Sequence, residues 1–550
     1  MKKIIFILGL AAVVLGTSCS DVLDLNPADR FSPATVWSTT TTADKYVIGL
    51  YSIFGANTEM RGGDAYASPR LSDAYSDILK STSWNQYNHN FNATLLQETA
   101  FNSNSAGAFE CWSSHYDRIR RENEFLRDAA EFGSKFGEDW LKIRIAEVRF
   151  CRAYAYFMLC RVYGGVILRT EVDGPEQNDK ARSTEEECWG FIINELKELA
   201  PDLPLKWDSD NSGRATQKAA YGLLSRVALY AEKWDVAAQA ARDCATAEGN
   251  LDLSENGYAK IFELGINSPE VLFAVEFKSS VIDHAYDAYV RPSGDTKELG
   301  KQVYSGFVPT SELVDSYEMA GDGGNFSWEK HGKDPYANRE PRFYATILYN
   351  GADWMGRIES FVGGKDGYKA YENAGAAGTT VTGYYLRKYL IDGDKTWVTS
   401  GSGQDWIVLR YAEVLLNKAE ALAMENWNKN SAEALQALND VRARVGLPAR
   451  ATADKETFLE YVRHERKVEL AGEGFRYWDL RRWRLAEKVI DGQNVHGVKI
   501  SKQSDGSFTY EQVDADGGHK RIFYDRYYRF AIPLSERSNN SLCTNNDGWI

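Results

Sequence analysis

Motifs of the common enzyme classes are the first features that could do chemistry in this sequence. The nearest approach to a zinc-binding helix is HERKV, in which Val468 takes the place of the second histidine ligand, so the H-E-x-x-H pattern fails. The sequence has no G-x-S-x-G nucleophile elbow, no Walker-type phosphate loop and no G-x-G-x-x-G fingerprint. We therefore predict no catalytic residues, no metal ligands and no cofactor. The seven histidines are scattered, at His89, His115, His284, His331, His464, His496 and His519.

A dense group of charged residues near the C-terminus is the second candidate for chemistry. It lies on adjacent predicted helical turns and alternates with aromatic residues such as Tyr477 and Trp478. Arginine forks that bind carboxylates among aromatic rings often lock helices together, so we interpret the group as structural, with an active site as the alternative. A carboxylate pair that cleaves glycosides needs a separation of about 5–10 Å, which sequence spacing does not give. The members are Glu465, Arg466, Glu469, Glu473, Arg476, Asp479, Arg481 and Arg482.

The N-terminal segment predicts export. Two lysines precede twelve apolar residues (4–15), a run too short to span a membrane as a resident helix. Small residues then lead to Cys19, and this layout resembles a bacterial lipoprotein signal, in which residues 1–18 are removed and the cysteine is lipidated. Gly16 departs from that pattern, where an aliphatic residue is usual. An ordinary cleaved signal with an incidental cysteine is the alternative.

The charge of the chain excludes some partners. The formal net charge is -14, and removal of residues 1–18 takes away two lysines and no acids, which leaves -16. Such a surface repels nucleic acid and anionic lipid. No later apolar run approaches the eighteen residues of a membrane helix. We therefore expect no nucleic-acid partner and membrane attachment through the N-terminal lipid only.

The six cysteines beyond Cys19 do not suggest a disulfide framework. Cys151 and Cys160 are nine residues apart in one predicted helix, a rise of about 13.5 Å and far beyond disulfide reach. The sequence contains no C-x-x-C. We expect most of these residues to be small buried hydrophobic side chains.

The elements that must carry any site are mostly helical. Residues 138–165 keep an apolar stripe over several turns and end at a Gly-Gly pair. Residues 215–249, 406–448 and 454–490 each read as a helix pair, with a rhythm of small and large residues that resembles a tetratricopeptide unit. We predict a mainly α, tetratricopeptide-like solenoid; unrelated helical hairpins are the alternative.

Two stretches differ from the helical segments in composition and in periodicity. Residues 60–108 and 250–405 are rich in Gly, Asn, Asp, Tyr and Trp and show little helical period. Long loops without secondary structure are usually functional or disordered, and the aromatic content argues against disorder. We expect long ordered loops and short strands that form a ligand-binding face on the helical scaffold.

Several long motifs resemble the SusD/RagB outer-membrane lipoproteins of Bacteroidetes. They begin with CSDVLDLNPADRFS and VWSTTTTADKYVIGLY and continue with GFVPTSELVDSYEM, DPYANREPRFYATILYNGADW and TTVTGYYLRKYL. They end with LRYAEVLLNKAEALA, ALNDVRARVGLP, ERKVELAGEGFRYWDLRRW and FAIPLSERSNNS. Glu340, where the family usually has Asp, and the terminal LCTNNDGW are departures. The resemblance covers nearly the whole chain.

The resemblance implies a role as well as a fold. Members capture a nutrient, usually a glycan, at the cell surface and pass it to a SusC-like TonB-dependent outer-membrane transporter, without catalysis. Some relatives bind peptides, so a peptide ligand is an alternative, as is an envelope scaffold that binds no small ligand. We divide the chain into a signal peptide (1–18), an N-terminal SusD-like region (19–250) and a C-terminal RagB/SusD region (251–550).

A glycan site needs flat apolar rings flanked by polar groups. STSWNQYNHN sets two aromatic residues beside two asparagines, and DHAYDAYVRP and GGNFSWEK supply further aromatic residues in loops. Trp354 and Trp397 are weaker candidates, and Trp140, Trp189, Trp234, Trp427 and Trp478 lie in helical patterns and are assigned to packing. The predicted ligand-binding residues are Trp84, Tyr87, Asn88, Tyr286, Tyr289, Arg291 and Trp328.

Overall fold

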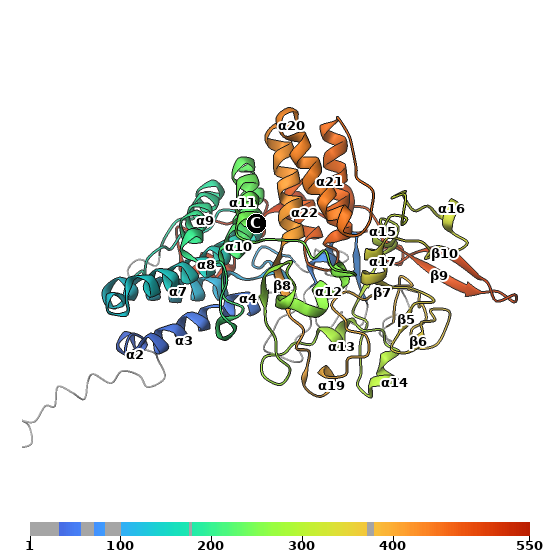
Figure 1. Cartoon of the computed structure of the whole chain (residues 1–550), viewed down its shortest axis with the longest axis horizontal. Coiled ribbons are helices and arrows are strands. Elements are labelled where there is room, and N and C mark those ends of the chain that lie inside the picture. The colour runs from blue at the N-terminus through green and yellow to red at the C-terminus, as the bar shows by residue number, and fades with distance from the viewer. Residues whose placement is uncertain (1–31, 57–70, 83–100, 175–178, 371–378, 550) are drawn as a thin grey trace, which may run out of the picture.

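The computed structural model describes residues 32–56, 71–82, 101–174, 179–370 and 379–549. Helices dominate it, and they pack in sequence: α7 on α8, α8 on α9, α9 on α10 and α10 on α11 (Figure 1). The long helices of this first block are α3 (Thr40–Leu50), α7 (Trp112–Phe132), α8 (Glu138–Tyr163), α9 (Glu185–Leu199), α10 (Gln217–Tyr230) and α11 (Trp234–Thr246).

A second helical block continues the first one in space. Helix α11 packs against α20 (Tyr411–Arg444), and α20 packs against α21 (Lys455–Glu469), although more than 160 residues separate α11 from α20 (Figure 1). Asn426 has non-helical dihedrals (φ -166°, ψ 92°) and divides α20 into two helices. The predicted helix pairs are therefore present, and the prediction of a mainly α, tetratricopeptide-like repeat fold is confirmed.

Local sequence signals explain where the helices begin and end. Thr184 caps α9: its hydroxyl accepts from the Glu187 N–H, and Glu187 Oε2 accepts from the Thr184 N–H at 2.8 Å. Helix α8 ends before Gly164, whose φ of +75° is a conformation that glycine adopts at little cost. Helix α8 is buried on nearly every face over most of its length, so it forms the centre of the first block.

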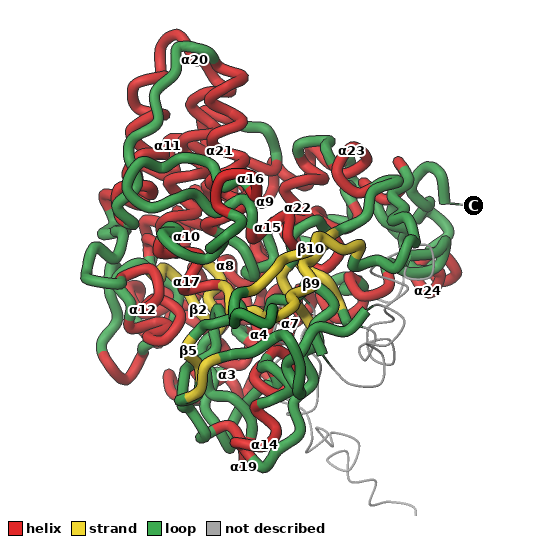
Figure 2. The backbone as a smooth tube through the Cα atoms, turned by 90° about the vertical axis from the view of Figure 1, so that its right-hand side faces the viewer, coloured by secondary structure: helices red, strands yellow, loops and turns green. Residues whose placement is uncertain are grey.

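The loop-rich half contains short elements. Figure 2 shows α14, α19 and β5 at the end of the molecule opposite α20, joined by loops. The short helices of the described residues, in this half and elsewhere, are α2 (Pro33–Val36), α4 (Ser52–Ala56), α12 (Gly257–Leu264), α13 (Tyr286–Val290), α14 (Asp295–Leu299), α15 (Ser311–Val314), α16 (Trp328–His331), α17 (Pro341–Thr346), α19 (Trp397–Ser400), α22 (Arg476–Arg482), α23 (Ala486–Ile490) and α24 (Leu534–Asn539).

The strands form antiparallel pairs, and several pairs join distant segments. β1 (Leu79–Ser81) pairs with β3 (Phe307–Pro309), and β2 (Val271–Val275) pairs with β8 (Trp406–Arg410). Three further pairs are seen among the described residues: β4 (Ile347–Leu348) with β7 (Tyr385–Leu386), β5 (Asp353–Trp354) with β6 (Arg357–Ile358), and β9 (His496–Lys502) with β10 (Phe508–Asp514). The division of the chain near residue 250 stays a prediction.

The cysteines agree with their expected role. Cys111, Cys151, Cys160, Cys188, Cys244 and Cys543 are all buried, and no disulfide joins them. Among the described residues, no helix combines the length and the apolar character that crossing a membrane requires.

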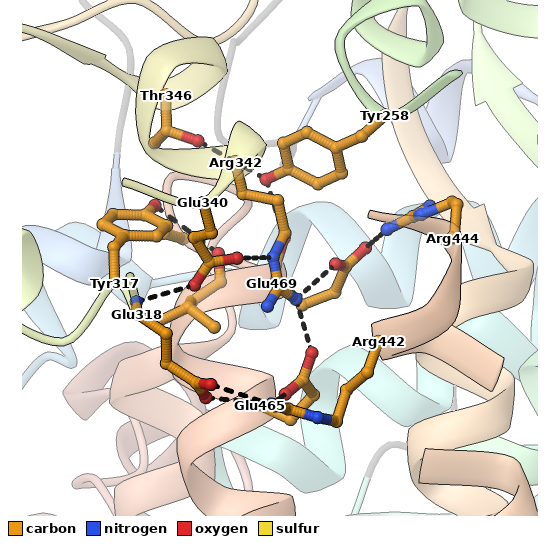
Figure 3. A network of polar contacts seen from close by, with 12 residues as sticks. Tyr258, Tyr317, Glu318, Glu340, Arg342, Thr346, Arg442, Arg444, Glu465 and Glu469 are labelled. Carbon is orange, nitrogen blue, oxygen red and sulfur yellow. Dashed lines mark hydrogen bonds and ion pairs between the residues drawn. The ribbon is translucent and has the colours of Figure 1, made fainter. Parts of the chain in front are cut away.

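A buried network of arginines and glutamates joins the second helical block to the loop-rich half (Figure 3). Glu469, at the end of α21, is its centre and is fully buried. Its carboxylate contacts Arg342 of α17 at 2.9 Å, Arg410 at the end of β8 at 2.6 Å, and Arg444 at the end of α20. Arg442 adds a second branch, to Glu318 at 2.8 Å and to Glu465 at 3.0 Å.

Most of the charged residues of the C-terminal group form ion pairs within the fold. Arg466 binds Asp479 at 2.8 Å, and Arg482 bridges Asp479 and Glu420 at 2.8 and 2.5 Å. Arg476 binds Asp77 at 2.8 Å, and Arg481 lies over the Trp478 ring. These side chains are engaged by one another and by aromatic rings, as the structural interpretation predicts.

Removing one carboxylate from the network should be costly. We predict that Glu469→Gln lowers the free energy of unfolding by about 3–5 kcal/mol, because the loss of one partner leaves buried arginine charge uncompensated. Glu460→Gln is the matched control, because Glu460 pairs with Arg463 on the surface and is 70% exposed, and it should cost less than about 1 kcal/mol. Urea denaturation of both variants measures the difference. A loss below about 1 kcal/mol for Glu469→Gln would contradict the assigned role.

The same network predicts acid sensitivity. Burial acts to raise the pKa of Glu318, Glu469 and Glu473, but facing basic side chains outweigh it and hold each pKa below its ordinary value. They are His464 and Arg442 at Glu318, arginines at Glu469, and Arg410 and Lys388 at Glu473. Carboxylates with a depressed folded-state pKa stabilise the fold above their unfolded pKa of about 4.5 and lose this contribution as pH falls. The free energy of unfolding should therefore drop between about pH 5 and pH 3. Glu469→Gln should show a shallower drop, and equal slopes for both proteins would refute the explanation.

Candidate functional site

The predicted ligand-binding residues fall into three structural classes. Trp84, Tyr87 and Asn88 lie outside the described residues, as does Cys19. Tyr286, Tyr289 and Arg291 belong to α13 and its C-terminal end. Trp328 begins α16. The structure therefore places four of the seven predicted residues.

Tyr286 and Arg291 are core residues. Both are 0% exposed; the Tyr286 hydroxyl donates to the Lys388 carbonyl at 3.1 Å, and Arg291 Nε donates to Asp287 at 2.9 Å. The Arg291 guanidinium also lies over the rings of Trp354 and Trp397, at 5.4 and 5.6 Å from their centroids. Direct ligand contact does not fit such burial, so their role is corrected to packing beneath the loop face.

Trp354 and Trp397, the weaker candidates, are also core residues. The tryptophans assigned to packing lie in the main core or pack against it. Trp354 is 0% and Trp397 1% exposed, so neither ring presents a face to a ligand. Trp189 and Trp478 are buried in the main core, and Trp140, Trp234 and Trp427 pack against it with part of each ring exposed.

Tyr289 is buried less completely than Tyr286 and Arg291. It is 6% exposed, and its ring lies 5.3 Å from that of Tyr304, which is half-buried. The backbone fixes this pair, because the Tyr304 N–H donates to the Ala288 carbonyl at 2.8 Å. Sequence reasoning missed Tyr304, whose only signal was an aromatic residue just before the motif that begins at Gly306.

Trp328 has the geometry of a fixed platform. Ser327 caps α16 through the Lys330 N–H, and the half-buried indole donates from Nε1 to Asp315 Oδ2 at 2.9 Å. The ring packs on Phe326 at 5.3 Å and Tyr510 at 5.9 Å. Burial raises the pKa of Asp315 to about 6, although the indole hydrogen bond acts against the shift. The contacts hold the indole in one orientation while part of it stays accessible.

Cavities offer other places for a ligand. One of about 790 Å³ lies between α3, α4 and β2 and is lined by Tyr51, Phe54 and Phe273, with Arg118 and Glu276 as charged neighbours. Another of about 360 Å³ lies between α12 and α17. None of the four predicted ligand-binding residues that the structure describes lines either cavity. The described residues contain no cluster of three or more His, Cys, Asp or Glu side chains arranged for a metal ion.

Comparisons with known proteins agree with this architecture. A family model described as the SusD family matches residues 269–549, and a second, described as starch-binding and associating with the outer membrane, matches residues 21–229. A SusD-like protein of Bacteroides ovatus is 25% identical, and the match covers 94% of this chain and 90% of that protein.

Solved structures show the same fold. A SusD-like protein of Bacteroides fragilis superimposes with a TM-score of 0.77 at 27% identity, covering 94% of this chain and 98% of that one. Another protein of that species, named a SusD-like carbohydrate binding protein, has a TM-score of 0.76 at 24% identity and covers 92% and 99%. One family model spans more than half of the chain, and the relatives match it almost end to end. The chain therefore belongs to the SusD family.

Proposed function

We propose that this protein captures a glycan at the cell surface and delivers it, uncut, to a SusC-like TonB-dependent outer-membrane transporter. In this proposal Cys19 carries the lipid that holds the protein on the outer membrane. Membership of the SusD family supports the class of function, and the carbohydrate-binding name of one fold neighbour supports the ligand class. The structural observation that carries the proposal is the fixed, half-buried Trp328 indole.

The Trp328 platform suits a sugar ring. Covering about 100 Å² of an aromatic face contributes roughly 2.5 kcal/mol, and the C–H face of a pyranose provides such a surface. Glu329 and Lys330 follow Trp328 and are exposed, so they are placed to bind sugar hydroxyls. A few such contacts give weak affinity once ordering costs are subtracted, which suits a protein that releases its cargo to a transporter.

The proposal assigns further glycan contacts to the remaining candidates. Tyr289 and Tyr304 form a second aromatic pair on the loop-rich half. Trp84, Tyr87 and Asn88 remain proposed ligand contacts on the strength of their sequence context. A glycan longer than one sugar would need several such contacts.

A substitution at Trp328 tests the site. Trp328→Ala should weaken binding by about 1–3 kcal/mol, or roughly 5- to 150-fold, because the stacking surface is lost. Trp328→Phe should keep part of the affinity. The ligand is first identified on a panel of purified polysaccharides, and its oligosaccharides are then titrated by calorimetry.

Trp427→Ala is the matched control for this experiment. Its indole is also half-buried and hydrogen-bonded, to the Ala453 carbonyl at 2.9 Å, but it lies on the helical repeats. Its loss should leave affinity unchanged. Unaltered affinity of Trp328→Ala would remove Trp328 from the site, and shortened oligosaccharide after incubation with pure protein would refute the non-catalytic part of the proposal.

The anchor gives a separate test. Cys19→Ala should release the protein from the outer membrane, because the variant has no thiol for the acyl chains that hold it there. Cells expressing the variant are fractionated and washed without detergent, in a strain that lacks the proposed SusC-like transporter so that protein contacts do not retain it. Ser18→Ala, which keeps the cysteine, is the control. Full retention of Cys19→Ala would contradict lipidation at this residue.

A further inference from the structure

The β9–β10 hairpin leaves one strand edge uncovered. It projects from the loop-rich half (Figure 1). The inner strand is tied down, because the Val498 N–H donates to the Thr382 carbonyl at 2.8 Å and the His496 N–H donates to Glu312. The outer strand, β10, is exposed along most of its seven residues, including Phe508 at 37%.

The register of the hairpin shows which backbone groups face outward. The Gln503 N–H donates to the Ser507 carbonyl at 2.8 Å and closes the ladder, and β10 then pairs residue by residue with β9. Hydrogen-bonded and non-hydrogen-bonded pairs alternate in an antiparallel ladder, so Thr509 and Glu511 bond inward. Phe508, Tyr510 and Gln512 therefore direct their N–H and C=O groups away from β9.

These outward groups form a continuous pattern. No residue in the described part of the chain hydrogen-bonds the backbone N–H or C=O of Phe508, Tyr510 or Gln512. Donors and acceptors thus recur at every second residue, about 6.8 Å apart. An extended polypeptide has the complementary repeat, and adding one to an exposed sheet edge is a known mode of recognition.

We propose that the β10 edge binds an extended segment of a partner protein, which lies beside β10 as a third strand. The proposal does not depend on the glycan site. The side chains of β10 also define which residue types the segment must contain, because directly opposed residues on one face of a sheet contact each other.

The face of β10 that is turned toward the body is aromatic. Tyr510 packs on Trp328 at 5.9 Å and on Tyr336 at 5.6 Å, and Phe508 lies on the same face as Tyr510. Partner residues opposite Phe508 and Tyr510 would contact these rings. Apolar residues at alternate positions of the segment fit this face.

The other face of β10 carries one acidic residue, Glu511, between Thr509 and Val513. Glu511 is 70% exposed, and Lys499 of β9 lies 3.6 Å from it. β10 contains no basic residue. A lysine or arginine of the segment, opposite Glu511, would therefore be favoured. The occupant is thus a segment that alternates apolar and basic residues.

A second copy of this chain fits the edge less well. Antiparallel self-pairing that uses all three outward positions is symmetric about Tyr510 and sets Glu511 opposite Thr509. Because β10 contains no lysine or arginine, a second copy offers Glu511 no opposite charge. The charge on β10 therefore favours a basic partner over a second copy.

Synthetic strands test the proposal. The probe is a blocked peptide of about nine residues that alternates valine and lysine, titrated into the purified full-length protein by calorimetry. With its valines on the aromatic face, the valine N–H groups point at β10. N-methylation of the valines should therefore weaken binding by about tenfold or more, whereas N-methylation of the lysines should leave it within about threefold.

Variants of β10 complete the test. Gln512→Pro removes an outward N–H and should weaken binding of the parent peptide by about tenfold, and Gln512→Ala, which keeps the N–H, should not. Glu511→Lys should shift preference to a valine–glutamate peptide. Melting curves check that each variant is folded.

Several results would overturn the proposal. Equal binding of the two methylated peptides would show attraction by charge alone, with no strand addition. Unchanged binding by folded Gln512→Pro would exclude this edge. A dimer of the full-length protein that Gln512→Pro dissociates, with no peptide bound, would make a second copy the occupant.

Discussion

The arrangement of this molecule depends on the buried ion-pair network around Glu469. Its arginines come from separate parts of the chain: Arg342 from α17, Arg410 from the end of β8, and Arg444 from the end of α20. All three side chains are nearly inaccessible to solvent. The Glu469 carboxylate therefore holds α17, β8 and α20 together at one point (Figure 3).

Such a network is costly to bury, because each ion loses several kcal/mol of hydration. Its geometry accepts few alternatives, since the guanidinium forks match only carboxylates placed at set angles. We interpret its presence as a means of orienting the loop-rich half on the repeats. The proposed capture of a glycan by the loop face needs that orientation, because this face is built from short helices and two-residue strands.

Sequence patterns predicted the helical repeats well because their signals are local. The small residues of α10 and α11, the cap at Thr184 and the stop at Gly164 all act within a few residues. The structural role of the charged C-terminal group was also readable, from the aromatic residues between its members. Its distant partners, such as Arg342 and Glu318, were not, because only the folded chain brings them to Glu465 and Glu469.

The candidate site was predicted less well, and burial is the reason. Tyr286 and Arg291 look like loop residues in sequence, but both are buried in the fold. Tyr286 bonds the Lys388 carbonyl, and Asp287, Trp354 and Trp397 surround Arg291. Trp328 stood in a similar sequence context and stayed partly accessible. Local composition does not distinguish these outcomes. The outward edge of β10 likewise follows only from the register of the hairpin.

The central claim is that ligand is held by the loop-rich half while the network and repeats stay fixed. Hydrogen–deuterium exchange of the full-length protein, with and without a saturating oligosaccharide, tests it most directly. The account predicts slower exchange around Tyr289, Tyr304 and Trp328 and unchanged exchange in α10, α11, α20 and α21. Protection confined to those helices, with none around Trp328, would contradict it.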